Sequence, residues 1–318
     1  MPYVCLPLIW YNSHMDSKYQ VLLYYKYVAI PNPEEVRDSQ RILCEKLKLK
    51  GRIIIASEGV NGTIEGETQA TEKYIAEMEK HPLFKNTHYK RSTGTGDAFP
   101  KLKVKYRPEI VTSGLNEVSP TITTGKYLTA EQLHSWFEEK REFYIVDMRN
   151  DYEYASGYFE NFIPSGIHNF FDIKEVLPKL AHLKEKTIVT VCTGGVRCEK
   201  ASGLLVINGF KDVYQLLDGI QTYMEKYPNQ HFKGKLYVFD NRLTVGFNTD
   251  SNEHTIVGVC EKCNVSCDTY TNCEYDMCHY HYLCCDNCKD NETGLAFCKA
   301  ECKEKYLTFQ LPKERKIA

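Results

Sequence analysis

The residues best suited to covalent chemistry lie in the segment CTGGVRC at positions 192–198. An apolar run ends at Cys192, two glycines follow, and the helix-forming residues EKASGLL come next. A thiol at this junction would lie at the amino end of a helix, where backbone N–H groups stabilise a thiolate. Gly194 and Gly195 would let the loop curl around the sulfur, and Arg197 would add a fixed positive charge. The pattern therefore predicts that Cys192 is a nucleophile.

The spacing from Cys192 to Arg197 distinguishes two kinds of chemistry. It is C-x4-R, a six-residue loop that encloses an atom about the size of sulfur, whereas cysteine phosphatases use the longer C-x5-R loop. A phosphatase is therefore disfavoured. Cys198 follows in the first turn of the expected helix, where it could resolve an oxidised Cys192 as a disulfide or simply pack in the core. The sequence leaves both roles open.

The elements around this loop alternate between strands and helices. Strands are expected at 143–148, 187–192 and 212–217, and helices at 129–140, 151–156, 172–183 and 198–208. The first two strands are continuous apolar runs, which are typical of buried parallel strands. Residues 125–232 are therefore expected to form an α/β domain that presents the Cys192 loop. The stretch 235–247 after it is expected to be an extended connector.

Residues 16–120 are expected to form a separate α+β domain. Strands are expected at 20–28 and 52–56, and the segment 58–66 is expected to turn through Asn61-Gly62 into a third strand; helices are expected at 34–49 and 68–80. A fourth strand, long or split, would cover 88–91 and 101–107. The order β-α-β-β-α-β predicts a ferredoxin-like fold. Because the strand pattern begins only at Tyr19, Met15 is an alternative start and the first 14 residues would then be an upstream extension.

Basic residues gather near the end of this first domain. In the segment 101–107, four basic residues alternate with apolar ones, so strand geometry puts on one face Lys101, Lys103, Lys105 and Arg107. Such a face must meet solvent or a polyanion, and an edge strand kept soluble by its lysines is the alternative reading. With Arg91 and the glycines and hydroxyls of 91–97 nearby, we expect contact with phosphates. The formal net charge is only -2, so any nucleic-acid contact must be local.

The last part of the chain, 250–318, is rich in cysteine. Of the 14 cysteines, eight form close pairs in this part: Cys260 and Cys263, Cys273 and Cys278, Cys285 and Cys288, and Cys298 and Cys302. Two of the pairs have the C-x2-C spacing of structural zinc sites, and metal binding would stabilise a segment that has few aliphatic residues. We expect two zinc ions, with an iron–sulfur cluster, disulfides or free thiols as alternatives. The spacing does not assign cysteines to particular ions.

Composition fits a cytoplasmic, multi-domain protein. At 318 residues the chain is long enough for two or three domains, and its hydrophobic fraction of 42% is that of a folded protein. No apolar stretch reaches the length of a membrane span, and the opening residues lack the features of a signal peptide. The sequence displays no flavin or nicotinamide fingerprint and no evident iron site of two histidines and one carboxylate.

A first resemblance concerns the α/β domain. The segment IVDMRNDYEYASGYF at 145–159 resembles the rhodanese signature, in which a strand ends in D-x-R and is followed by E and G, and LLDGIQTY at 216–223 is similar to the closing rhodanese motif. Asp147 and Arg149 match the polar pair that, by this resemblance, braces the active-site loop. Rhodaneses commonly have histidine after the glycine, whereas this chain has Tyr158.

A second resemblance covers nearly the whole chain from about Tyr19. The segments YKYVAIPNPEE, GRIIIASEGVNGTIEG, KLKVKYRPEIV and CTGGVRCEKAS, followed by the cysteine-rich tail, resemble in their order the tRNA uridine hydroxylase family. The resemblance implies a ferredoxin-like domain, a rhodanese domain and a cysteine-rich extension. It also implies oxygen-dependent formation of 5-hydroxyuridine at wobble position 34 of tRNA, with molecular oxygen as co-substrate and Cys192 as the essential residue.

The chemistry suggests a mechanism for such a reaction. C5 of uridine is hard to attack directly, so we hypothesise that the Cys192 thiolate adds to C6 and generates an enolate whose C5 takes up oxygen. One alternative is a sulfurtransferase that passes a Cys192 persulfide to an acceptor. Another is an RNA- or protein-binding adaptor with an idle rhodanese fold, against which the intact Cys192 and Arg197 argue.

Overall fold

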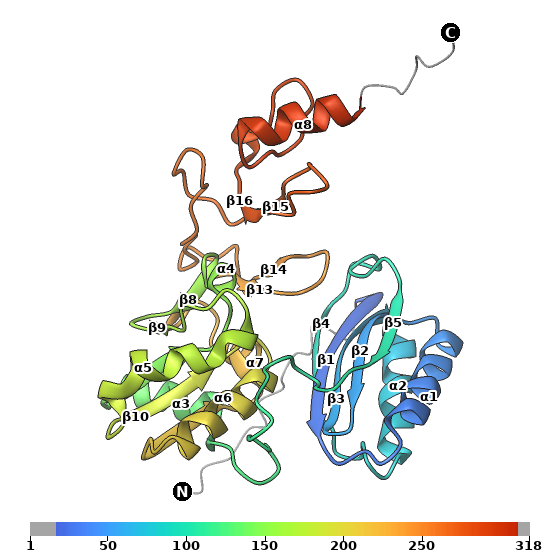
Figure 1. Cartoon of the computed structure of the whole chain (residues 1–318), viewed down its shortest axis with the longest axis vertical. Coiled ribbons are helices and arrows are strands. Elements are labelled where there is room, and N and C mark those ends of the chain that lie inside the picture. Colours follow the sequence, from blue (N-terminus) through green and yellow to red (C-terminus); the bar gives the residue numbers. More distant parts are fainter. Residues whose placement is uncertain (1–16, 311–318) are drawn as a thin grey trace, which may run out of the picture. The chain divides into compact units, whose positions relative to one another are not determined.

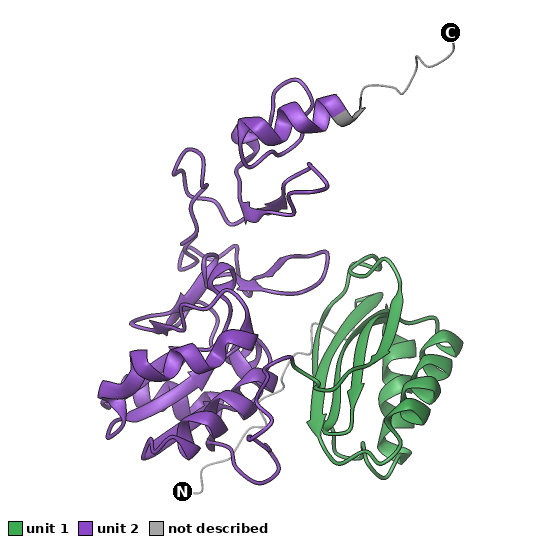
Figure 2. Ribbon diagram, in the orientation of Figure 1, with its two compact units in different colours: residues 1–111 green, residues 112–318 purple. Residues whose placement is uncertain are grey.

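The computed structural model describes residues 17–310, so the alternative start at Met15, the expected domain start at residue 16 and residues 311–318 lie outside the described part (Figure 1). The chain divides into two compact units, residues 1–111 and 112–318 (Figure 2). Each unit has its own sheet and its own hydrophobic core.

The first unit has the predicted ferredoxin-like order of elements. These are β1 (Tyr19–Tyr27), α1 (Pro33–Lys46), β2 (Lys50–Ala56), β3 (Gly59–Glu67), α2 (Thr68–Lys80), β4 (Tyr89–Thr93) and β5 (Leu102–Tyr106). The strands form one sheet in the order β4-β1-β3-β2-β5, and α1 and α2 lie on one face of it (Figure 1). Alternate residues of the strands, such as Leu22, Ile53 and Val104, are buried in the core on that face.

The expected fourth strand is two separate strands at opposite edges of this sheet. β4 pairs antiparallel with β1, whereas β5 pairs parallel with β2. The connection between them is fixed by the buried carboxylate of Glu65, which accepts hydrogen bonds of 2.8 Å from the backbone N–H groups of Thr95, Gly96 and Ala98. A long strand cannot form because this carboxylate holds the connection in a loop.

The turn expected at Asn61-Gly62 is wrong. The chain reverses at residues 57–58, and Asn61 and Gly62 lie inside β3, opposite Tyr25 and Tyr24 of β1. Gly62 is needed there because the Tyr24 ring lies 2.4 Å from the place of a β-carbon. This glycine therefore provides space for a tyrosine and does not form a turn.

The second unit contains the expected α/β domain. Its elements are β6 (Lys126–Leu128), α3 (Ala130–Glu138), β7 (Tyr144–Asp147), α4 (Asp151–Tyr154), β8 (Gly157–Phe159), β9 (Ile163–Pro164), η1 (Phe170–Glu175), α5 (Val176–Leu180), η2 (Ala181–Leu183), β10 (Thr187–Val191), α6 (Val196–Ile207), β11 (Asp212–Leu216) and α7 (Gly219–Lys226). A parallel sheet has the order β6-β11-β10-β7-β9. The helix expected at 172–183 is broken into short pieces around Pro178, because proline lacks the N–H that a continuous helix needs.

The remainder of this unit is made of short strands and loops. β12 (Phe232–Gly234) pairs with β8, and the tail contains β15 (Tyr270–Asn272), β16 (His281–Leu283), η3 (Asp286–Cys288) and α8 (Ala300–Gln310). The extended connector expected at 235–247 is instead a hairpin of β13 (Leu236–Tyr237) and β14 (Thr244–Val245). Its turn is closed by Arg242, which donates to Asp240 at 2.7 and 2.8 Å. Within residues 17–310 there is no helix long and apolar enough to cross a membrane.

Candidate active site

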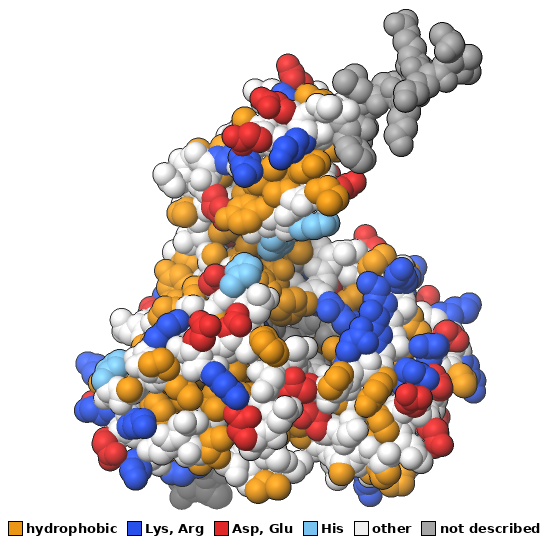
Figure 3. All heavy atoms as spheres, in the orientation of Figure 1, with side chains coloured by type: hydrophobic (Ala, Val, Ile, Leu, Met, Phe, Trp, Pro, Cys, Tyr) orange, Lys and Arg blue, Asp and Glu red, His pale blue; other side chains and the backbone are white. Residues whose placement is uncertain are grey.

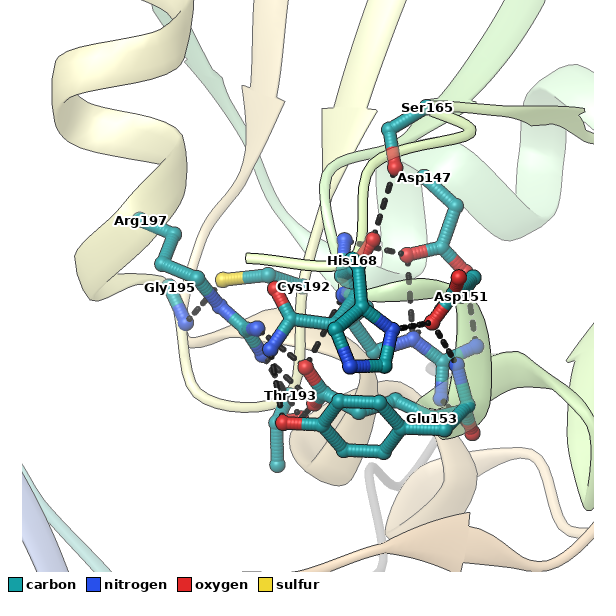
Figure 4. Close-up of polar contacts among 12 residues, drawn as sticks. Asp147, Asp151, Glu153, Ser165, His168, Cys192, Thr193, Gly195 and Arg197 are labelled. Atoms are coloured by element: carbon teal, nitrogen blue, oxygen red, sulfur yellow. Dashed lines mark hydrogen bonds and ion pairs between the residues drawn. The ribbon is translucent and has the colours of Figure 1, made fainter. Parts of the chain in front are cut away.

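Cys192 follows β10 directly and precedes α6, at the strand-to-helix junction that the sequence predicts. Gly195 adopts a left-handed conformation with φ of 99° and donates its backbone N–H to the Cys192 sulfur at 3.2 Å (Figure 4). Gly194 is buried in the same turn. The loop also accepts two hydrogen bonds from the start of α7, because the N–H of Ile220 bonds to the Cys192 carbonyl at 2.9 Å and that of Gln221 to Thr193. The loop is therefore fixed from both sides.

The environment of Cys192 favours its thiolate form. The side chain is buried, with only 1% exposed, and burial alone would raise its pKa. A hydrogen bond from the Cys198 thiol, the charge of Arg197 and the backbone N–H groups of both residues outweigh burial and lower the pKa of Cys192 to about 6. The pKa of Cys198 itself is raised, first by burial and then by its bond to Cys192. One thiol of the pair is thus poised to ionise while the other keeps its proton.

The guanidinium of Arg197 is held by a residue that the sequence analysis did not select. Glu153, at 0% side-chain exposure, accepts from both terminal nitrogens of Arg197, from Nη2 at 2.8 Å (Figure 4). Nη2 also donates to the Thr193 hydroxyl at 3.3 Å. A buried pair of this kind fixes the planar guanidinium beside the loop. The signal that could have found Glu153 is the glutamate of the rhodanese-like signature, which also closes a capping box with Asn150.

Asp147 and Arg149 support the site through Glu153 and do not bond to Cys192. Arg149 is fully buried and donates to Asp147 at 2.6 and 3.0 Å, to the Gly157 carbonyl at 2.8 Å and to the Glu153 carbonyl at 3.3 Å. These bonds shape residues 153–157 and so set the position of the Glu153 carboxylate. The two residues therefore belong to the buried hydrogen-bond network around Glu153, the partner of Arg197.

The lowered pKa gives a direct prediction for thiol reactivity. Alkylation of Cys192 by iodoacetamide is expected to rise with pH around a midpoint near 6 and to level off above neutrality, because the thiolate is the reactive form. In Cys198→Ala the midpoint should move upward, since the largest stabilising hydrogen bond is lost. Mass spectrometry of the labelled peptides measures both. Cys44, whose pKa burial raises to about 12, is the internal control; a Cys192 midpoint near that of an ordinary thiol would contradict the geometry.

The predicted basic residues do not form one surface. Lys103 and Lys105 are exposed on β5, opposite Val104, which faces the helices, and Lys101 and Arg107 flank the strand and are exposed. Figure 3 shows a group of Lys and Arg side chains on this unit. Arg91 lies on β4 at the other edge and is paired with Glu72 of α2 at 2.9 and 3.1 Å. The N–H groups of the glycine loop are bonded to Glu65, so this loop is not a ready-made phosphate site.

The eight paired cysteines of the tail form two groups of four. The sets are Cys260, Cys263, Cys285 and Cys288, and Cys273, Cys278, Cys298 and Cys302, and in each set the sulfurs lie within 4.8 Å of one another. In sequence order, the first cysteine pair thus shares a set with the third pair, and the second pair shares a set with the fourth. The interleaving arises because the β15–β16 hairpin places one pair after each of its strands. The ring of His281 stacks on that of Tyr270, with 4.8 Å between the ring centroids, and Cys267 and Cys284 are buried outside the two sets.

Each set fits a tetrahedral ion bound by four sulfurs. Zn–S bonds of about 2.3 Å in a tetrahedron put neighbouring sulfurs about 3.8 Å apart. Three sulfur–sulfur separations are close to this: Cys263 to Cys285 at 3.6 Å, Cys278 to Cys298 at 3.5 Å and Cys298 to Cys302 at 3.6 Å. The tail can therefore hold two metal ions.

A third group of possible ligands was missed by the sequence analysis. His134 and Glu138 lie one turn apart on α3, and His231, just before β12, brings its Nε2 to 3.2 Å from Glu138. Both rings are also stacked, His134 on Tyr227 and His231 on Phe137. The separation of His231 from α3 in the sequence hides this group of two histidines and one carboxylate.

Known protein families match three stretches of this chain. Family models match at residues 19–110 (UPF0176 acylphosphatase like domain), 129–226 (Rhodanese-like domain) and 233–303 (Rhodanase C-terminal). Three relatives are named tRNA uridine(34) hydroxylase. The protein of Cytophaga hutchinsonii is 39% identical over 90% of this chain and 90% of its own. The protein of Bacillus licheniformis is 39% identical over 91% of this chain and 89% of its own. The protein of Onion yellows phytoplasma is 41% identical over 85% of this chain and 88% of its own. Identity at this level over nearly the full length of both chains, together with the Cys192 loop, means that the chain belongs to the tRNA uridine(34) hydroxylase family.

Proposed function

We propose that this protein hydroxylates uridine 34 of tRNA to 5-hydroxyuridine, with molecular oxygen as co-substrate and Cys192 as nucleophile. The observation that carries the proposal is a buried thiol at the start of a helix, in a loop fixed by Gly195, Arg197 and Glu153, in a chain of this family. The lowered pKa of this thiol supports the proposal. We propose that the tail, the rhodanese domain and the first domain have separate roles in this reaction. The protein is proposed to act in the cytoplasm, where tRNA is found.

The chemistry begins with covalent addition. The Cys192 thiolate adds to C6 of the uracil ring, which makes C5 electron-rich as an enolate, and oxygen is then taken up at C5. Arg197 stabilises the thiolate before attack and the loop N–H groups stabilise it when it leaves. Because Cys192 is only 1% exposed, the loop must open transiently to admit any reagent, and tRNA binding is proposed to favour the open form that admits the flipped base.

The basic side of β5 is proposed to contact the tRNA backbone. Lys101, Lys103, Lys105 and Arg107 are exposed and close together along the chain, and phosphate contacts by such residues supply affinity without sequence selectivity. Arg91 is left out of this surface because Glu72 already pairs with it.

This proposal predicts a specific change in salt dependence. Lys103→Ala/Lys105→Ala should weaken tRNA binding and lower the slope of log affinity against log salt by roughly 1.5, since each phosphate contact contributes about 0.7 to 0.9. Filter binding at several salt concentrations measures the slope. Lys46→Ala/Lys73→Ala, on the exposed sides of the helices, is the matched control. Equal slopes for the two double variants would place the RNA elsewhere.

The tail is proposed to hold two structural zinc ions, one in each set of four cysteines. Four-thiolate sets leave no open position for a substrate, so the role is to fold the segment. Zinc is the proposed metal because the sulfur separations and the short pair spacings fit it.

The proposed function is tested on bulk tRNA. Cells that lack the gene are complemented with the wild-type gene, and nucleosides are analysed by mass spectrometry. We expect a uridine that carries one additional oxygen atom only in complemented cells. The six-residue loop also suits a persulfide carrier. If oxygenated uridine is unchanged and thiolated nucleosides fall in the deletion strain, the protein is a sulfurtransferase and the hydroxylase proposal is wrong.

A further inference from the structure

Hydroxylation by dioxygen needs two electrons, because one oxygen atom enters the product and the other leaves as water. The reaction therefore needs a two-electron donor besides dioxygen. This question rests on the proposed function, since a persulfide carrier would need no such donor.

A second thiol lies directly beside the nucleophile. Cys198 is 0% exposed, and its backbone N–H bonds to the Gly195 carbonyl at 3.0 Å, which places it in the first turn of α6. Its thiol donates a hydrogen bond to Cys192 and also interacts with Thr190 at the end of β10. Gly195 links the two residues, because its carbonyl accepts from the Cys198 backbone N–H at 3.0 Å and its own N–H donates to the Cys192 sulfur at 3.2 Å.

Other described thiols are placed differently. Cys44 belongs to the core of the first unit, the eight paired cysteines of the tail belong to the two candidate metal sets, and Cys267 and Cys284 pack in a buried cluster of the tail. Cys198 is thus the thiol that the fold brings to the reactive loop. Its burial also protects it from adventitious oxidants, because oxidation of cysteine depends on thiolate character and exposure.

We propose that Cys192 and Cys198 act together as a dithiol that supplies both electrons of the hydroxylation and ends the turnover as a disulfide. The overall reaction is uridine plus dioxygen plus two thiols, giving 5-hydroxyuridine, one disulfide and one water. Dioxygen is the oxidant, and an external dithiol reductant regenerates the enzyme after each turnover.

The individual steps balance. Cys192 adds to C6, and C5 binds dioxygen in two one-electron steps, which after protonation leaves a hydroperoxide on C5. The Cys198 sulfur attacks the outer oxygen, the O–O bond breaks, and Cys198 becomes a sulfenic acid while C5 keeps a hydroxyl. Loss of the C5 proton expels Cys192 and restores the aromatic ring. The Cys192 thiolate then attacks the Cys198 sulfenic acid, which forms the disulfide and releases water.

The test is a turnover experiment without reductant. The reduced full-length protein is desalted, mixed with unmodified tRNA in oxygenated buffer and analysed for 5-hydroxyuridine and for disulfides. Trypsin cleaves after Arg197 and Lys200, so a disulfide links peptide 187–197 to peptide 198–200. We expect one 5-hydroxyuridine per chain with an equal amount of linked peptide, and further turnovers when a dithiol reductant is added.

Variants keep the test decisive. Cys198→Ser is expected to give less than a tenth of the single-turnover yield, while it still forms a covalent adduct with 5-fluorouridine tRNA without oxygen, which shows that the Cys192 loop is intact. Cys267→Ala, a buried cysteine outside both metal sets, should behave as wild type. The double variant His134→Ala/His231→Ala should also behave as wild type. If this variant lost hydroxylation and its Cys192 and Cys198 peptides stayed unlinked, a metal would be the electron source and the dithiol proposal would be wrong.

The outcomes separate this proposal from the function itself. If wild-type protein hydroxylates several tRNAs per chain without reductant, or if hydroxylation leaves both cysteines reduced, the dithiol proposal is wrong and the hydroxylase proposal stands. If no 5-hydroxyuridine forms even with excess dithiol reductant and oxygen, the hydroxylase proposal is wrong and the dithiol proposal falls with it.

Discussion

Cys192→Ser is expected to lower the rate of 5-hydroxyuridine formation by roughly a thousandfold or more, because loss of a covalent nucleophile is among the largest single losses in catalysis. A serine hydroxyl does not ionise near neutral pH, so it cannot add to C6 of uracil. Serine is close to cysteine in size, so the loop held by Gly195 and by the Arg197–Glu153 pair should keep its shape. Nucleoside mass spectrometry after reaction of the purified protein with tRNA measures the yield.

The same variant tests the proposed covalent step. Wild-type protein should form an adduct with tRNA that contains 5-fluorouridine, visible as a shifted band under denaturing conditions, and Cys192→Ser should form none. Cys44→Ala is the matched control, because Cys44 is equally buried but lies in the first unit. If Cys192→Ser retained both the adduct and the activity, another residue would have to be the nucleophile.

Local features of the site could be predicted from the sequence. A strand end, two glycines and a helix start lie within seven consecutive residues, so the position of the Cys192 thiol at a helix start follows from local geometry alone. The ferredoxin-like order of the first unit and the buried parallel strands of the second also follow from short-range patterns. These are the features that depend on neighbours in the chain.

Features that depend on distant partners were missed. Glu153 is 44 residues from Arg197, and the two meet only because β7 and β10 are adjacent in the sheet. The expectation that Arg91 lies near the lysines of β5 was wrong for the same reason, because β4 and β5 lie at opposite edges of the sheet. The spacing within each cysteine pair is local, so the sequence predicted the pairs correctly. Which pairs share a set depends on the β15–β16 hairpin and could not be predicted.

Removal of one metal ion is expected to unfold much of the tail. Cys263→Ser/Cys285→Ser deletes two of four proposed ligands from one set, one from each of its pairs. Structural zinc contributes about 10–16 kcal/mol of apparent binding free energy in small domains, and the tail has few aliphatic residues to replace it. We expect the wild-type chain to carry two zinc ions by elemental analysis, the double variant to carry one, and residues 255–310 of the variant to become sensitive to protease.

Loss of this metal ion should also change the active site if the tail supports the Cys192 loop. If the tail folds independently of the loop, the active site should not change. The Tyr270 hydroxyl donates to the Tyr152 carbonyl, and Lys235, which follows β12, pairs with Asp268 of the tail at 2.9 Å. Tyr152 adjoins Glu153, the residue that holds Arg197, so an unfolded tail should loosen the guanidinium and raise the pH midpoint of Cys192 alkylation. Cys267→Ala should keep two ions and the wild-type midpoint. A double variant with one ion but an unchanged midpoint would show that the tail folds without supporting the loop; in that case its role must be sought in RNA binding.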